Sequence, residues 1–99
     1  MRWEVTVSHK QVLEKLVAYL REEVPMVRQF DICSGGVGDF GLVLEAPLAI
    51  NFNDKRTAFA GTLASLCTLS GWAMTSLICE TADLKADIAA IHSEITYAR

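Results

Sequence analysis

The chain has 99 residues, enough for one small domain near the lower size limit for a self-sufficient hydrophobic core. Hydrophobic residues make up 52% of it and charged residues 21%, an apolar balance that favours burial of further surface in a homodimer or higher homo-oligomer. The net charge is −3, and Lys55-Arg56 is the only basic cluster, which argues against nucleic-acid binding because that normally needs a basic face.

The cysteines and histidines point to a cytoplasmic protein without a metal centre. Cys33, Cys67 and Cys79 are odd in number and lack CxxC spacing, so we expect free thiols in a reducing compartment. The first ten residues lack the apolar core of a signal peptide. His9 and His92 lie far apart, and no Cys/His/Asp spacing indicates a metal, so we expect neither a metal nor another cofactor.

The first predicted element is an amphipathic helix that begins near Ser8. Its apolar positions recur at helical spacing and are Leu13, Leu16, Val17 and Leu20. Pro25 ends the helix, because the residue before a proline avoids the helical region.

A β-hairpin is predicted next. Val27, Phe30 and Ile32 are strand-forming residue types, and the glycine-rich stretch CSGGVGD (33–39) predicts a turn before a second strand, FGLVLEAPL (40–48). Pro47 marks the end of strand pairing because it has no N–H to donate.

A long uncharged helix is predicted from Thr57 to Cys79. It is about 23 residues long, or roughly 35 Å, which would also cross a bilayer. Frequent Ser and Thr residues, with Gly61 and Gly71 within the run, favour a buried helix of a soluble domain over a single membrane span. Both interpretations stay open at this point.

A third strand is predicted near the C-terminus, in IAAIHSEITYAR (88–99). Ala89, Ile91, Ser93, Ile95 and Tyr97 alternate with polar or small neighbours, as a strand with two different faces requires.

The order of helix, two strands, long helix and strand resembles the hot-dog fold of acyl-thioester enzymes. The residues that carry this resemblance lie between Ala46 and Met74, and they are similar to the thioesterase domain often found C-terminal to GNAT-type acetyltransferases. That family typically shows Pro-Leu, then N-x-N, then G-T-A-F-G-G-S and a later G-W. The matching positions, in order, are Pro47-Leu48, Asn51, Asn53, Thr57-Ala58-Phe59, Gly61 and Gly71-Trp72.

The resemblance implies an α+β fold in which an antiparallel sheet wraps around one long central helix. The broader pattern extends from roughly Phe30 to Tyr97, and we expect residues 1–99 to form a single hot-dog domain. The resemblance implies that this domain is incomplete, because complete hot-dog domains carry further strands. Three positions depart from the pattern. Arg56 stands where the family usually has glycine, Ala60 replaces the first glycine of a pair, and Thr68 stands where many relatives carry a carboxylate.

The resemblance also implies hydrolysis of a fatty acyl thioester of coenzyme A or acyl carrier protein, with a site between the subunits of a cytoplasmic homodimer that involves no membrane. Backbone N–H groups at a helix N-terminus would stabilise the oxyanion. The substrate-binding residues would be Thr57, Ala58, Phe59 and Gly61, with Lys55 and Arg56 facing the phosphates of coenzyme A. Asn53 or Asn51 would hold the carbonyl or the attacking water, and Asp54 is the nearest candidate general base.

Simpler roles remain open for the same residues. Asn53 or Asp54 would also serve as a helix N-cap. Lys55 and Arg56 would also form an ordinary exposed pair, and Thr57 would also be a first-turn helix residue. At the level of the protein, the alternative is a non-catalytic acyl-binding or dimerisation module on the same fold.

Overall fold

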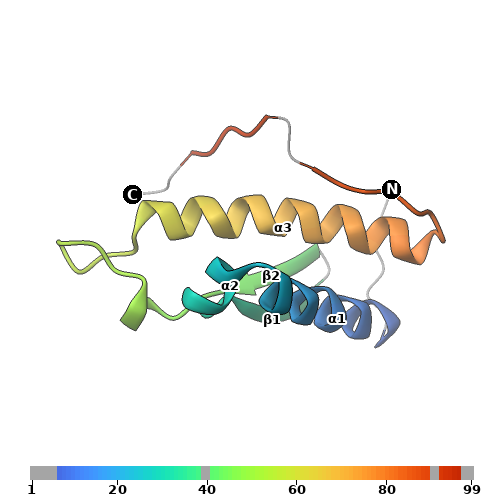
Figure 1. The fold of residues 1–99 in the computed structure, drawn as a ribbon, viewed down its shortest axis with the longest axis horizontal. Coiled ribbons are helices and arrows are strands. Elements are labelled where there is room, and N and C mark those ends of the chain that lie inside the picture. Colours follow the sequence, from blue (N-terminus) through green and yellow to red (C-terminus); the bar gives the residue numbers. More distant parts are fainter. Residues whose placement is uncertain (1–6, 39–40, 90–91, 97–99) are drawn as a thin grey trace.

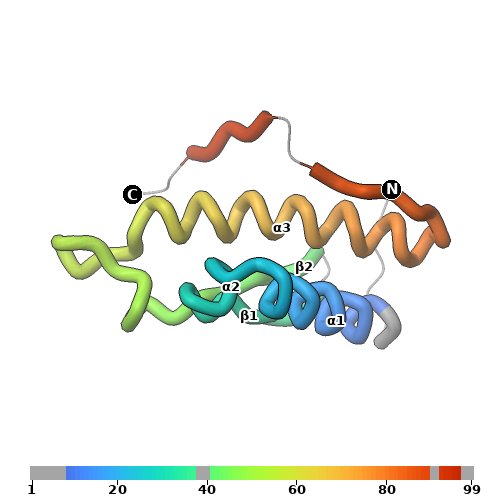
Figure 2. Tube along the Cα trace, in the orientation of Figure 1, coloured from blue at the N-terminus to red at the C-terminus, as the bar shows by residue number. Residues whose placement is uncertain are grey.

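The computed structural model describes residues 7–38, 41–89 and 92–96. The elements run along the chain in the order α1 (Val7–Glu23), α2 (Pro25–Gln29), β1 (Cys33–Gly38), β2 (Gly41–Glu45), the 3-10 helix η1 (Leu48–Ile50) and α3 (Ala60–Thr81). Helix α3 lies along a layer made by α1, α2 and the β1–β2 hairpin (Figure 1). After α3 the chain turns back and runs along the other side of this helix (Figure 2).

Helix α1 confirms the predicted amphipathic helix and its end before Pro25. Leu13, Val17 and Leu20 are buried, and the helix stops at Glu23. Leu13 and Val17 pack against Ala73 of α3. The local spacing of apolar residues therefore gave both the helix and the face that it buries.

The predicted hairpin exists, but its boundaries are different. The stretch expected to be its turn, from Cys33 onward, forms strand β1, which pairs antiparallel with β2 from Cys33↔Glu45 to Gly38↔Gly41. The glycines allow the bulge and the close packing of this strand. A β-bulge lies between Ser34 and Gly36, which has φ +108°, and a Cβ on Gly35 would come within 2.8 Å of the Val43 side chain.

The residues expected to form the first strand lie instead in α2 and in the turn after it. Pro25 occupies the start of α2, where its fixed φ suits a helix. Val27 and Ile32 are buried against Leu20. Between them the chain reverses at Asp31, which has φ +54°. The apolar character of Val27 and Ile32 therefore indicates that they are buried, and does not indicate a strand.

Helix α3 begins at Ala60 and not at Thr57, and it ends at Thr81. It is long and apolar enough to span a membrane by length and composition, which is weak evidence because central helices of soluble domains pass the same test. Thr62, Ala73 and Leu77 are its buried residues.

The third predicted strand does not form in the described residues. Residues 84–89 and 92–96 have no regular secondary structure, and Ile91 and Tyr97 lie outside the described residues. The hairpin lies on the other side of α3 (Figure 1), so this segment has no described strand with which to form a ladder.

We expect Leu13→Ala to lower the free energy of unfolding by about 2–5 kcal/mol, because the side chain is fully buried between α1 and α3. The matched control is Leu16→Ala, which lies on the same helix but is only half-buried and should cost clearly less. Urea unfolding of both variants measures the difference. Equal losses would contradict the described core.

Candidate functional site

The polar cluster before α3 forms a compact loop, Asn51–Phe59, which we call the 51–59 loop. Its two sides meet in an isolated antiparallel bridge between Phe52 and Ala58. Within the bridge, the Asn53 N–H donates to the Thr57 carbonyl (2.9 Å), and at the base the Phe59 N–H donates to the Asn51 carbonyl (2.9 Å). The loop projects at the left end of the view in Figure 1 and leads directly into α3.

Asn53 organises the interior of this loop. Its Oδ1 accepts hydrogen bonds from the backbone N–H groups of Lys55 (2.9 Å) and Thr57 (3.1 Å), while its Nδ2 donates to Thr57 Oγ1 (2.9 Å). The expected alternative as helix N-cap is wrong for both Asn53 and Asp54, because α3 starts at Ala60. The cap position is Phe59, which makes no side-chain cap hydrogen bond. Thr57 likewise precedes the helix and is not a first-turn residue.

Asp54 and Lys55 are exposed at the tip of the loop. Their side chains are 87% and 81% exposed and form an ion pair at 3.7 Å. Both groups are thus open to a ligand that approaches from solvent, as a general base and a phosphate contact would have to be.

Arg56 adopts a backbone conformation that explains why glycine suits this position. Its φ is +64°, in the left-handed region that residues with a Cβ rarely enter. Its guanidinium lies over the Phe52 ring, 4.5 Å from the ring centroid, a cation–π contact that compensates in part for the strained backbone.

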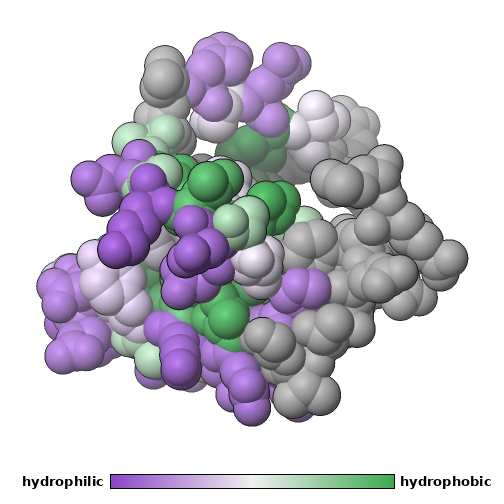
Figure 3. Space-filling view, turned by 90° about the vertical axis from the view of Figure 1, so that its right-hand side faces the viewer, coloured by the Kyte–Doolittle hydropathy of each residue, from purple (hydrophilic) through white to green (hydrophobic). Residues whose placement is uncertain are grey.

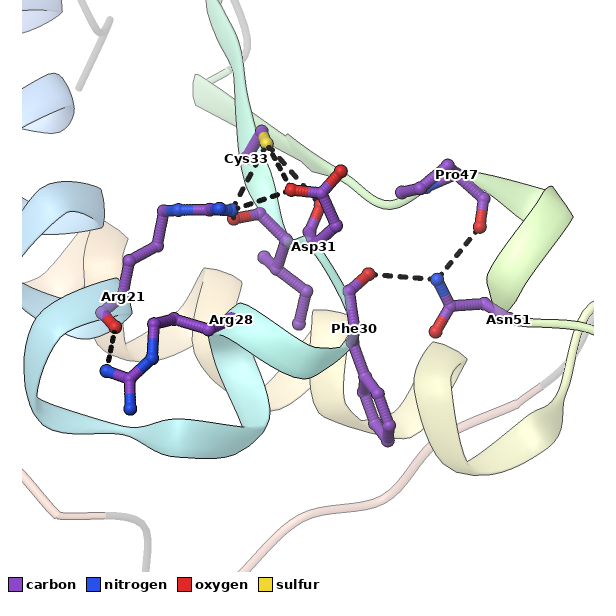
Figure 4. A network of polar contacts seen from close by, with 8 residues as sticks. Arg21, Arg28, Phe30, Asp31, Cys33, Pro47 and Asn51 are labelled. Atoms are coloured by element: carbon purple, nitrogen blue, oxygen red, sulfur yellow. Dashed lines mark hydrogen bonds and ion pairs between the residues drawn. The ribbon is translucent and has the colours of Figure 1, made fainter.

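Asn51 is buried, unlike the residues of the loop tip. Its Nδ2 donates to the carbonyls of Phe30 (2.9 Å) and Pro47 (2.8 Å), as Figure 4 shows, and its Oδ1 accepts from the Thr62 hydroxyl (3.0 Å). The sequence analysis singled out Asn51 but not Thr62. The spacing of 11 residues between them carries no signal that sequence reasoning could have used.

The first turn of α3 has backbone N–H groups without helical partners. In the described chain, no hydrogen bond is donated by the N–H of Gly61 or Thr62, and the first intrahelical-type bond is from Leu63 to the Phe59 carbonyl (3.1 Å). The Phe59 ring covers the space beside Gly61, where a Cβ would overlap it. Phe59 therefore already occupies the room that glycine leaves for a close approach.

A crevice of about 510 Å³ runs between α3 and the segment after it. Leu69, Trp72 and Ile88 supply apolar lining, and Thr68 lines it from the middle of α3, with His92 opposite on the returning chain. In the described residues, no three His, Cys, Asp or Glu side chains are placed to hold a metal ion.

A second polar network lies at the start of β1, beside Asn51 (Figure 4). Arg21 Nη1 contacts Asp31 Oδ1 (3.0 Å) and the Ile32 carbonyl (3.0 Å). Burial raises the pKa of the Cys33 thiol, the Asp31 carboxylate raises it further, and the Arg21 guanidinium offsets part of this rise. A raised pKa disfavours the reactive thiolate, so Cys33 suits a structural position.

A family model described as "Putative thioesterase (yiiD_Cterm)" matches residues 13–99. The chain belongs to this family. A putative thioesterase from Shewanella oneidensis, known from its crystal structure, superimposes with a TM-score of 0.83 at 30% identity; the match covers 88% of this chain and 61% of that one. A protein of unknown function from Chlorobaculum tepidum TLS gives a TM-score of 0.71 at 28% identity, over 78% and 47% of the two chains. No curated protein sequence matches.

These matches confirm the α+β hot-dog fold expected from the sequence, with a small antiparallel sheet and one long helix. The chain spans less than two thirds of the length of either structure. Helix α3 is the long helix of this fold, and the 51–59 loop leads into its N-terminus.

We expect Arg56→Gly to be more stable than Arg56→Ala by about 1 kcal/mol, because both variants lose the contact with Phe52 but only glycine relieves the left-handed backbone. Thermal or urea unfolding of the pair isolates the backbone contribution. An alanine variant as stable as the glycine variant would show that residue 56 does not hold a positive φ.

The rate of Cys33 alkylation should reach its midpoint at a pH above the ordinary pKa of a cysteine thiol, because only the thiolate reacts and its pKa is raised. The measurement is the iodoacetamide rate against pH in a Cys67→Ser, Cys79→Ser background. A midpoint at or below the ordinary value would contradict the partly buried environment beside Asp31.

Proposed function

We propose that the protein hydrolyses fatty acyl thioesters of coenzyme A or acyl carrier protein. The observation that carries this proposal is the first turn of α3, whose Gly61 and Thr62 N–H groups donate no hydrogen bond in the described chain and follow a polar loop in a member of a thioesterase family. Such N–H groups lie at the positive end of the helix dipole, where they favour negative charge.

Thioester hydrolysis requires a site that stabilises negative charge on the thioester carbonyl oxygen. Water attacks the carbonyl carbon, the oxygen becomes an oxyanion, and the C–S bond then breaks to release the thiol. The N–H groups of Gly61 and Thr62 would donate to that oxygen, which makes the contact stronger in the transition state than in the ground state. Phe59 has to move, or to pack against the acyl group, for the carbonyl to approach Gly61.

Asp54 is the proposed general base. Its exposed carboxylate would take the proton from the attacking water and return it to the departing sulfur. Asn53 fixes the loop that carries Asp54 through side-chain hydrogen bonds with Lys55, Thr57 and Ala58, so it supports the base by holding its backbone in place.

The two ends of the substrate would lie on different surfaces. Lys55 and Arg56 are exposed cations beside Asp54 and would contact the phosphates of coenzyme A or of the carrier-protein arm. The acyl chain would run along α3 into the crevice that contains Leu69 and Trp72, where apolar side chains would shield it from water.

A homodimer or higher homo-oligomer in the cytoplasm is part of the same proposal, with no role for nucleic acid or membrane. All three cysteines are free thiols, as a reducing compartment favours. The end of the molecule where α3 finishes shows hydrophobic residues between hydrophilic ones (Figure 3), and large apolar residues such as Tyr19 and Ile78 are exposed. Surface of this kind is suited to contact with another subunit.

Thr68 favours a second candidate, an acyl-binding module without turnover. It lies in the crevice where many relatives carry a carboxylate, and a threonine hydroxyl cannot serve as a base near neutral pH. On this alternative, acyl-coenzyme A binds and raises the melting temperature, but no thiol is released.

We expect the purified protein to release thiol from a series of acyl-coenzyme A substrates of increasing chain length. Asp54→Asn should lower kcat by a factor of about 10²–10⁴ without unfolding the protein, since it removes an exposed base. Glu14→Gln is the matched control, because it removes another exposed carboxylate, on α1 and outside the loop.

Three results separate the possibilities. Thiol release that Asp54→Asn abolishes and Glu14→Gln preserves supports the hydrolase. A rise in melting temperature without thiol release supports the binding module; saturation at about a hundred times Kd corresponds to roughly 2.7 kcal/mol of added stability. A protein that neither binds nor hydrolyses any acyl-coenzyme A or acyl carrier protein contradicts both.

A further inference from the structure

Thr62 makes a hydrogen bond that differs from those of three other hydroxyl residues of α3. The hydroxyls of Ser65, Thr75 and Thr81 each donate to the carbonyl one turn earlier in their own helix, at 2.9, 2.9 and 3.0 Å. The Thr62 hydroxyl instead donates out of the helix, to Asn51 Oδ1 at 3.0 Å. Both side chains are buried, with Thr62 3% and Asn51 6% exposed.

The Asn51 amide cannot contact a substrate in this arrangement. Both of its N–H groups are used by the carbonyls of Phe30 and Pro47, and its oxygen accepts from Thr62. A buried amide whose two donors and oxygen are all hydrogen-bonded is a structural junction, since breaking any of these bonds would leave a polar group inside the protein with a lost partner.

This junction fixes the helix turn that the proposed reaction uses. Asn51 holds the start of α3 at two points, through its carbonyl to the N–H of the cap residue Phe59 (2.9 Å) and through its side chain to Thr62 in the helix. These two points enclose Gly61, whose N–H is one of the two proposed oxyanion donors. The direction of that N–H relative to the 51–59 loop therefore depends on the Thr62–Asn51 hydrogen bond.

We infer that Thr62 is a positioning residue of the site, whose buried hydroxyl orients the first turn of α3 through Asn51. The inference rests on the proposed hydrolase function for its catalytic consequence. Thr62 contributes its backbone N–H directly to the reacting oxygen, and its side chain acts only through Asn51. This separates the two roles of one residue, because substitution changes the side chain and leaves the backbone donor present.

The test compares Thr62→Val with Thr62→Ser and Thr81→Val in the whole protein. Valine has nearly the shape of threonine but no hydroxyl, serine restores the hydroxyl, and Thr81→Val removes a hydroxyl that bonds only within α3. Decanoyl-coenzyme A is the probe, and thiol release gives kcat and KM. We expect Thr62→Val to lower kcat about 10²-fold with little change in KM, because misplacement of a donor acts on the transition state.

Thr62→Ser should return kcat to within a few-fold of the parent, and Thr81→Val should leave it unchanged. If Thr62→Val does not fold, Thr62→Ala takes its place, because alanine favours the helix while also removing the hydroxyl. An unchanged kcat in the folded variant, or a loss that serine does not rescue, would overturn the inference.

Amide hydrogen exchange at Phe59 tests the junction without reference to activity. The Phe59 N–H is bonded to the Asn51 carbonyl, so Thr62→Val should speed its exchange by about tenfold or more, and Thr81→Val should not. If the parent protein hydrolyses no thioester, the proposed function fails while this measurement still decides the positioning role. An unchanged exchange rate of the Phe59 amide in Thr62→Val would contradict the positioning role of Thr62.

Discussion

The buried amide of Asn51 is the interaction on which the arrangement of the other elements depends. It joins three segments that are distant in sequence: the turn at Phe30 before the hairpin, Pro47 after the hairpin, and Thr62 in α3. A buried amide must find its hydrogen bonds inside the protein, and each one left unmade costs about 1–3 kcal/mol. The hairpin can therefore leave and rejoin the core only where both carbonyls reach the same side chain, which fixes its ends relative to α3.

A second set of contacts prepares the Phe30 turn for this junction. Arg28 donates to the carbonyl of Glu22 at the end of α1 (2.7 Å), and Arg21 holds both the Asp31 carboxylate and the Ile32 carbonyl. Charged donors at the C-terminal end of a helix satisfy carbonyls that have no helical partner. They also stabilise the chain reversal at Asp31, where φ is positive. The short helix α2 thus delivers the Phe30 carbonyl to Asn51, while the apolar core alone would leave this turn without a fixed direction.

The elements that the sequence predicted correctly are those whose signal is local. Leu13, Val17 and Leu20 repeat at helical spacing, and that repeat alone determines both α1 and its buried face. The glycines of β1 were wrongly predicted to form a turn. Gly35 is needed because the Val43 side chain of the neighbouring strand leaves no room for a Cβ, and this close contact exists only once the strands have paired. The alternation around Ile95 likewise describes a strand only when a neighbouring strand is present. Burial and pairing partners come from the tertiary structure, so these boundaries could not be read from residue types.

The candidate site divides in the same way. Asn53, Asp54, Lys55 and Arg56 are adjacent in sequence, so their gathering in one loop could be predicted, whereas the link from Asn51 to Thr62 could not. The buried and the exposed residues have different structural tasks. The buried pair fixes the first turn of α3, and Asn53 closes the loop by its own hydrogen bonds, so neither task depends on the exposed side chains at the tip. The positive φ of Arg56 lies in the part of the loop that Asn53 closes, whereas the hydrogen bonds that fix the start of α3 come from Asn51.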